Sequence, residues 1–213
     1  ASALEAAAPG RRAVVVGHSM GAMASLALAA ARPELFGPRI AGLVLVGAAA
    51  GDLVRSAVGG LAEILRSGRS LAEALRRVDG LRRHVMASRT DVGALLARLT
   101  QFGPHAPRAA VEHVVALAAR APSTVWTNGL ASLVGADLRD ALAHVRVPVL
   151  VVVGDHDRVT PRAAAEVLVG ALPQAELEVL EGAGHVPMLE RPEALNALIE
   201  AFASRVLDGE GSR

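Results

Sequence analysis

A serine stands at the centre of the segment Gly-His-Ser-Met-Gly at residues 17–21. The apolar run Ala13–Val16 precedes it, and an alanine-rich stretch follows it. This order predicts a strand, a tight turn and a helix, with Ser19 at the apex of the turn. The glycines Gly17 and Gly21 lack the Cβ atoms that would collide with the strand and the helix of such a strained turn. We therefore expect Ser19 to be a nucleophile rather than part of an ordinary glycine-rich turn.

A serine hydroxyl needs a base to take its proton and a third group to orient that base. The predicted strand Pro148–Val153 is followed by Gly-Asp-His-Asp-Arg-Val-Thr-Pro, and the predicted strand Leu177–Leu180 by Glu-Gly-Ala-Gly-His-Val-Pro-Met. Both segments follow the carboxyl ends of parallel strands, where open α/β sheets place their sites. The first segment offers the carboxylates Asp155 and Asp157 and the second offers His185, and the order Ser19, Asp157, His185 is the order serine, acid, histidine known for one class of hydrolase triad.

Other polar residues compete for these roles. Asp155 lies in the same loop as Asp157, where we expect it to brace the loop, and Asp52 follows an earlier strand. His18 and His156 flank the proposed site, and we expect them to pack or to form hydrogen bonds. The remaining histidines have no spacing typical of a metal site; they are His84, His105, His113 and His144. No metal and no cofactor is therefore expected.

Apolar strands and helical patterns alternate along both ends of the chain. The runs Ile40–Val46 and Pro148–Val153 are continuous, as in strands that are buried on both faces of a parallel sheet. Helical patterns at Arg162–Leu172 and Pro192–Val206 separate or follow the later strands. The alternation predicts an α/β fold with a parallel sheet.

Between Gly51 and about Arg146 the pattern contains no strand-like run. Short amphipathic helices are predicted instead, at Leu53–Leu65, Leu71–Val78, Val92–Leu99, Arg108–Ala119 and Ser123–Leu133. We therefore divide the chain into a core segment at 1–51, a helical cap or lid inserted at 52–146, and a second core segment at 147–213. Phe102 and Trp126 are candidates to line a substrate pocket in the cap, although core packing is the simpler interpretation for both.

Composition excludes several classes of protein. The 213 residues are 52% hydrophobic and carry a formal net charge of +1, enough apolar material for one substantial domain. Aromatic residues make up 2% of the chain, too few for base-stacking platforms, so a nucleic-acid partner is not expected. No apolar run approaches the ~20 residues that span a bilayer. Cysteine is absent, which fits the cytoplasm and also fits an exported protein without disulfides.

The three motifs together resemble the α/β-hydrolase fold family, and the resemblance covers nearly the whole chain. Within that family the chain is similar to capped bacterial esterases, non-haem haloperoxidase-like enzymes and carbon–carbon bond hydrolases. The resemblance implies that Ser19 is the nucleophile, Asp157 the acid and His185 the general base. It also implies that the backbone N–H of Met20 is one oxyanion donor. A small ester or related acyl compound would be the substrate, cleaved through an acyl-enzyme on Ser19.

The chain departs from the family pattern before its nucleophile. Members of the family carry several strands and a His-Gly-type loop there, and the loop donates the second oxyanion N–H, whereas only 18 residues precede Ser19 here. We therefore expect an N-terminally truncated α/β-hydrolase fold, in which the run Ala13–Val16 exposes an apolar edge. A compact variant, or a partner that completes the sheet, is the alternative. The oligomeric state stays open.

The same residues are compatible with more than one function. A Ser19–His185–Asp157 triad also serves perhydrolases, non-haem haloperoxidases and carbon–carbon bond hydrolases. A non-catalytic binding protein with this fold and an interfacial lipase are the remaining hypotheses. A serine at position 19 argues against the haloalkane dehalogenase and epoxide hydrolase branches, which use aspartate there.

Overall fold

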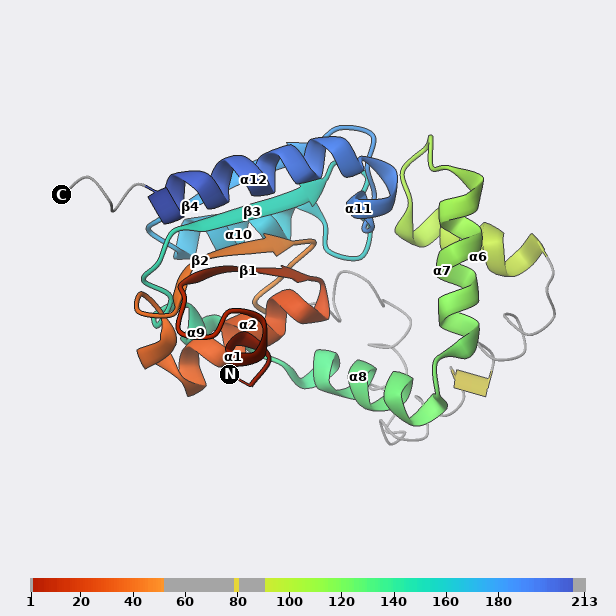
Figure 1. Cartoon of the computed structure of the whole chain (residues 1–213). Coiled ribbons are helices and arrows are strands. Elements are labelled where there is room, and N and C mark those ends of the chain that lie inside the picture. The colour runs from red at the N-terminus through yellow and green to blue at the C-terminus, as the bar shows by residue number, and fades with distance from the viewer. Residues whose placement is uncertain (1, 52–78, 81–90, 209–213) are drawn as a thin grey trace.

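A computed structural model describes residues 2–51, 79–80 and 91–208 of the chain. Strands and helices alternate along these residues, as expected for an α/β fold (Figure 1). Two of the predicted helices, at 53–65 and 71–78, lie outside the described residues, as does Asp52.

The described strands form one parallel sheet in the order β1 (Ala13–His18), β2 (Ile40–Val46), β3 (Val149–Gly154) and β4 (Ala175–Leu180). Every residue of β2 and β3 is buried, because these continuous apolar runs are covered on both faces. β1 and β4 are the edge strands of this sheet and are partly exposed. Val16 on β1 is 48% exposed, which agrees with the apolar edge that the sequence predicts.

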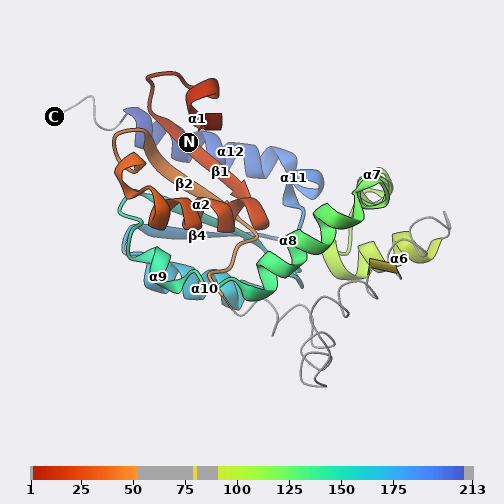
Figure 2. The same cartoon turned by 90° about the horizontal axis from the view of Figure 1, so that it is seen from below.

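Helices cover both faces of the sheet (Figures 1 and 2). On one face, α2 (Met20–Ala31), α9 (Arg139–Leu142) and α10 (Arg162–Ala171) bury Leu26, Leu142 and Leu168 against alternate residues of β2 and β3. On the other face, α12 (Pro192–Asp208) buries Leu195, Phe202 and Val206 against the intervening residues. The shorter elements are α1 (Ser2–Ala7), the 3₁₀ helix η1 (Pro33–Leu35) and α11 (Pro187–Glu190).

Gly42 explains how α12 lies so close to β2. A Cβ atom on Gly42 would lie 3.0 Å from Cε1 of Phe202, so the missing side chain makes room for the buried aromatic ring. The large apolar surface of Phe202 then fills the layer between helix and sheet.

Between β2 and β3 the described chain is helical, in α6 (Asp91–Gln101), α7 (Arg108–Arg120) and α8 (Ser123–Gly135). These match three of the predicted helices to within three residues, and we call α6–α8 the helical insertion. α6 and α7 lie beyond the carboxyl ends of the strands, beside α11 (Figure 1). No helix among the described residues has the length and hydropathy needed to cross a membrane.

The last residues of the predicted 52–146 segment pack with the sheet. Helix α9 contributes Leu142 to the main core cluster, and Val145 joins the same cluster. The N–H of Leu138 donates to the carbonyl of Ala50, which ties the end of the insertion back to the end of β2. The chain that follows α8 therefore returns to the sheet beside the residue at which the chain leaves β2.

Candidate active site

Ser19 occupies the turn between β1 and α2 in a strained backbone conformation. Its φ of 51° and ψ of −116° make it the single non-glycine residue with a positive φ among those the structure describes. The Ser19 N–H donates to the carbonyl of Val46, 2.9 Å away, which fastens the turn to β2. Strain of this kind costs about 1–3 kcal/mol and persists where surrounding contacts enforce it, often at functional sites.

The two glycines beside Ser19 have different roles. A Cβ on Gly17 would lie 2.7 Å from Cα of Ala22, so glycine is required where the strand passes the helix. A Cβ on Gly21 would meet no atom within 4 Å apart from its own helix backbone. The expectation that Gly21 also avoids a collision is therefore wrong, because Gly21 lies in the first turn of α2 and faces open space.

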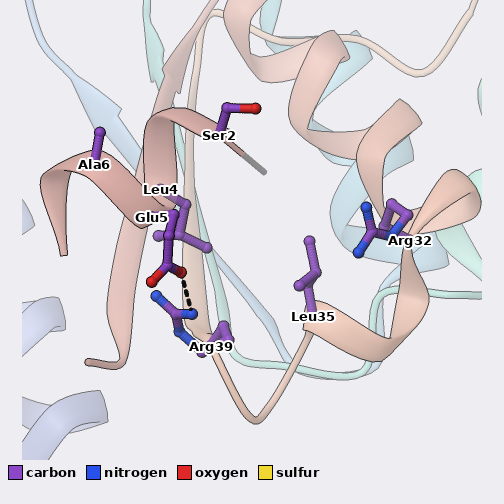
Figure 3. Close-up of a pocket in the computed structure, with 7 residues that line it drawn as sticks. All are labelled: Ser2, Leu4, Glu5, Ala6, Arg32, Leu35 and Arg39. Atoms are coloured by element: carbon purple, nitrogen blue, oxygen red, sulfur yellow. Dashed lines mark hydrogen bonds and ion pairs between the residues drawn. The ribbon is translucent and has the colours of Figure 1, made fainter. Parts of the chain in front are cut away.

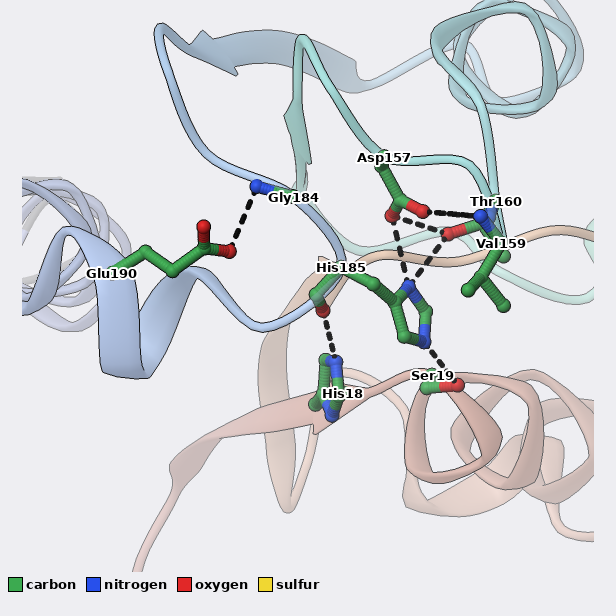
Figure 4. Close-up of polar contacts among 8 residues, drawn as sticks. All are labelled: His18, Ser19, Asp157, Val159, Thr160, Gly184, His185 and Glu190. Carbon is green, nitrogen blue, oxygen red and sulfur yellow. Dashed lines mark hydrogen bonds and ion pairs between the residues drawn. The ribbon is translucent and has the colours of Figure 1, made fainter. Parts of the chain in front are cut away.

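The structure brings Ser19, His185 and Asp157 together, although three separate segments carry them (Figure 4). His185 Nε2 lies 3.0 Å from Ser19 Oγ, and His185 Nδ1 lies 2.9 Å from Asp157 Oδ2. If Nδ1–H donates to the carboxylate, Nε2 is free to accept the proton of the serine hydroxyl. His185 and Asp157 are buried, and their contacts form one continuous hydrogen-bonded chain to the serine.

Asp157 is held by more groups than the sequence indicates. Its Oδ1 accepts the N–H groups of Val159 and Thr160, each at 2.8 Å, and its Oδ2 accepts the Thr160 hydroxyl at 2.8 Å. Burial raises the pKa of the Asp157 carboxyl. The hydrogen bond and charge of His185, with the bonds from Thr160, outweigh burial and leave that pKa below its usual range. The carboxyl is therefore kept ionised beside the imidazole.

The competing residues lie elsewhere. Asp155 is exposed and has its carboxylate 3.8 Å from Nε2 of His156.

Met20, the predicted oxyanion donor, is the first residue of α2, so its backbone N–H is at the positive end of the helix dipole. The Met20 side chain points toward α8, since a Cβ on Gly129 would lie 3.5 Å from its Sδ.

His18 contacts His185 directly. Its Nε2 lies 2.7 Å from the His185 carbonyl oxygen, and the two ring centroids are 4.9 Å apart. Burial lowers the pKa of His18, and the charge of His185 lowers it further, against the opposing effects of the carbonyl and of Asp157. A neutral His18 therefore donates its Nε2–H to the loop between β4 and α11, residues 181–186, which we call the base loop. This is the hydrogen-bonding role predicted for His18.

Gly47 and Thr160 were not identified as site residues from the sequence. Gly47 has a φ of +55°, and a Cβ there would lie 3.1 Å from His185 Nδ1 and 3.4 Å from Asp157 Oδ2. The side chains of His185 and Asp157 therefore pack directly against the backbone of Gly47, at the end of β2. Their positions in the sequence could have identified them, because both residues lie in loops that follow the carboxyl ends of strands, β2 and β3.

The candidate pocket residues of the helical insertion are only partly described. Phe102 is 2% exposed and packs with Ala97, Val111 and Val186, so core packing is its role. The Trp126 side chain lies outside the described part of the structure. Among the described residues, no three histidine or carboxylate side chains lie together in a way that would hold a metal ion.

A separate hollow of about 600 Å³ lies near the amino ends of β1 and β2, lined by α1, η1 and the end of α2 (Figure 3). Its charged groups already have partners. Arg39 Nη1 lies 2.6 Å from Glu5 Oε2, and Arg39 also donates to the carbonyls of Ala8 and Arg11. Arg32 pairs with Glu34. These contacts fasten α1 to the loop before β2, at the opposite end of the strands from Ser19.

Comparison with known proteins agrees with this architecture. The chain is 43% identical over 79 residues to a pimeloyl-[acyl-carrier protein] methyl ester esterase of Yersinia pseudotuberculosis, and 37% identical over 78 residues to the protein of that name from Serratia marcescens. Each match covers 37% of this chain and 31% of the relative.

Solved structures resemble nearly the whole chain. A hydrolase from Pseudomonas aeruginosa matches 94% of this chain and 68% of its own, with a TM-score of 0.69 and 25% identity. An esterase from Exiguobacterium antarcticum matches 91% of this chain and 67% of its own, with a TM-score of 0.68 and 22% identity. The model of the alpha/beta hydrolase family matches residues 1–198, and the chain belongs to that family.

Proposed function

We propose that this chain carries the catalytic residues of a serine hydrolase that cleaves carboxylic esters. The observation that supports this most directly is the hydrogen-bonded chain from Ser19 Oγ through His185 to Asp157, with spacings of 3.0 and 2.9 Å. Those distances fall in the range for proton transfer from a nucleophile to its base. The positive φ of Ser19 and the position of α2 behind it are further support.

In the proposed reaction, His185 Nε2 takes the Ser19 hydroxyl proton while Oγ attacks the ester carbonyl carbon. The tetrahedral oxyanion would accept the Met20 N–H at the start of α2, where the helix dipole favours negative charge. Asp157 stabilises the imidazolium through its bond to Nδ1. Collapse breaks the ester C–O bond, and His185 returns its proton to the departing alkoxide.

The second half of the reaction regenerates the serine. A water molecule gives a proton to His185 Nε2, and its oxygen attacks the acyl carbon of the acyl-Ser19. Collapse of the second tetrahedral intermediate releases the carboxylic acid, and Ser19 Oγ recovers its proton from His185. No metal or cofactor enters these steps.

We propose a small acyl ester as the substrate class. The curated relatives are named as methyl ester esterases of a pimeloyl group on an acyl-carrier protein, and a small alkyl leaving group suits the same mechanism. We further propose that the segment 52–146, which includes α6–α8, caps the site between the core segments 1–51 and 147–213. The Met20 side chain beside Gly129 of α8 supports a cap that reaches the serine turn. A cytoplasmic location fits a chain without cysteine.

A fluorophosphonate probe and a series of p-nitrophenyl esters test this proposal. The purified full-length protein should be labelled and should hydrolyse short-chain esters, and Ser19→Ala should abolish both. Ser204→Ala, an exposed serine on α12, serves as the matched control and should behave as the wild type. A folded protein that neither labels nor hydrolyses would refute the proposal and favour a non-catalytic binding protein.

A further inference from the structure

A carboxylate outside the proposed triad is buried beside it. Glu190 at the end of α11 is 5% exposed, and each of its oxygens accepts a backbone N–H. Oε1 accepts from Gly184 at 2.8 Å, and Oε2 accepts from Gly103 at 2.7 Å. Burying a carboxylate is costly unless it is hydrogen-bonded, so these bonds define a specific location for the side chain. Gly184 immediately precedes His185, the proposed base (Figure 4).

Gly103 belongs to the segment that follows α6, and the same segment also contacts His185 directly. The N–H of His185 donates to the carbonyl of Gln101, the last residue of α6, at 2.7 Å. Consecutive N–H groups of the base loop, at 184 and 185, are therefore held by Glu190 and by the end of α6. Neither of these two N–H groups donates to a strand of the sheet.

The two segments lie close enough that glycine is needed on both sides. A Cβ on Gly184 would lie 2.5 Å from the Gln101 carbonyl oxygen, and one on Gly103 would collide with the backbone of Gly182. The backbones therefore meet without intervening side chains. A shift of residues 101–103 would be transmitted to the base loop, because the two backbones are in direct contact at these glycines.

The loop between β3 and α10, residues 155–161, carries Asp157 and contacts the same end of α6. Arg158, next to Asp157, donates Nη1–H to the carbonyl of Leu99 in the last turn of α6. A guanidinium group is favoured at a helix C-terminus by the helix dipole. The last turn of α6 therefore touches both loops that hold the proposed acid and base, whereas Ser19 is fastened to β2 through Val46.

We propose that Glu190 is a positioning residue that joins the base loop to the end of α6 and thereby sets the distance between His185 and Ser19. This inference rests on the proposed function of the same site. On the side of β1, the bond from His18 to the His185 carbonyl joins the base loop to the serine turn. On the other side, Glu190 and the end of α6 hold the base loop, so the spacing of base and nucleophile also depends on this second junction. Misplacing a catalytic group by about 1 Å costs on the order of 100-fold in rate.

Glu190→Gln tests the role while keeping the size of the side chain. The amide oxygen accepts from one N–H group, and the amide NH₂ faces the other, so one of the two bonds is lost. Turnover per active site, counted by the end point of fluorophosphonate labelling, should fall about 10- to 100-fold, the loss expected for one charge-assisted hydrogen bond and a displaced base. KM should stay within about twofold, because Glu190 is proposed to act on the base rather than on substrate binding.

Glu200→Gln is the matched control, because Glu200 is an exposed residue of α12, outside the base loop. It should retain wild-type turnover per labelled site. Glu190→Asp is the second variant: it keeps the charge but is one methylene shorter, so it reaches fewer of the two N–H groups. Its turnover per labelled site should lie between those of the wild type and Glu190→Gln. It also provides the test if Glu190→Gln shows no cooperative melting transition.

The outcomes separate the two proposals. A lower labelled fraction with unchanged turnover per labelled site would mean that Glu190 only supports folding, and would overturn the positioning role. Full labelling with reduced turnover would support it. Absence of labelling and hydrolysis in the wild-type protein would instead refute the proposed function, and this inference with it.

Discussion

Removing the Thr160 hydroxyl is a sharp test of how the Asp157 carboxylate is held. Thr160 is 2% exposed, and its Oγ1 donates to Asp157 Oδ2 at 2.8 Å, the oxygen that also accepts from His185. Thr160→Val keeps the shape of the side chain and deletes this donor, together with the longer contact of 3.3 Å between the Thr160 hydroxyl and His185 Nδ1. The backbone bonds from Val159 and Thr160 to Oδ1 remain, as does the bond between Asp157 and His185. The variant therefore removes one of four hydrogen bonds on a buried carboxylate.

A hydrogen bond to a charged group contributes about 1.5–3 kcal/mol. The free energy of unfolding at pH 7 should fall by about that amount, and the melting temperature by roughly 3–12 °C for a chain of this size. Asp157 stays ionised and in contact with His185, so the proposed turnover should fall by less than about tenfold.

The pH dependence of this loss of stability shows whether the loss comes from the Asp157 carboxylate. The pKa of Asp157 lies below 3.8 in the folded protein, so its contribution to stability is complete above that pH and is lost as pH falls through the folded pKa. The Thr160 hydroxyl bond is one cause of the lowered pKa, so Thr160→Val raises the pKa of Asp157. The stability difference between wild type and variant should therefore be largest above about pH 4 and shrink toward pH 3.

Urea unfolding of both proteins between pH 7 and pH 3 measures this difference. Thr100→Val is the matched control, since Thr100 is exposed on α6 and its hydroxyl donates to the Leu96 carbonyl at 2.8 Å. Its effect should be within about 0.5 kcal/mol and independent of pH. The reasoning would be refuted if Thr160→Val destabilised the protein no more than the control, or by the same amount at every pH.

Two further substitutions test contacts beneath and beside the proposed base. Gly47→Ala should lower stability by about 1–2 kcal/mol through its positive φ and should also reduce turnover, because the methyl group would lie 3.1 Å from the imidazole Nδ1. Gly10→Ala, with a φ of +65° and no neighbour within 4 Å, should lose stability alone in the same unfolding and hydrolysis assays. For His18, whose folded pKa is lowered from 6.5, stability should fall as pH drops below 6.5, because the unfolded chain binds a proton that the folded chain does not. His18→Gln should flatten that decline in thermal melts between pH 7.5 and 5.5, and an unchanged slope would contradict a buried neutral imidazole.

The strands were predictable because a parallel sheet leaves a strong local signal. β2 and β3 are covered on both faces, and their sequences are uninterrupted apolar runs. β4 was predicted too short, at 177–180 instead of 175–180, because its edge position leaves Glu176 and Glu178 within an alternating pattern. The four-residue helices α9 and α11 were not predicted, since a single turn is too short to show helical periodicity.

The residues of the proposed triad were identifiable because each stands in a turn at the end of a strand. Ser19 is flanked by a glycine that its turn requires, and Asp157 and His185 follow β3 and β4. The choice of Asp157 over Asp155 was made from the family resemblance. The structure adds a physical distinction: the Asp157 side chain accepts backbone bonds within its own loop, whereas the side chain of Asp155 is exposed.

The Glu190 contacts were beyond sequence reasoning for a different reason. The bond from Gly103 to Glu190 joins residues 87 positions apart, and a backbone N–H leaves no trace in the residue type that donates it. The glycines at 103 and 184 are needed because two backbones meet, and a sequence does not distinguish such a glycine from one that only forms a turn. The readable clue was Glu190 itself, a carboxylate between Leu189 and the start of α12, in a segment otherwise packed against the core. A carboxylate in apolar surroundings has to find donors, and for Glu190 these are the backbone N–H groups of Gly103 and Gly184.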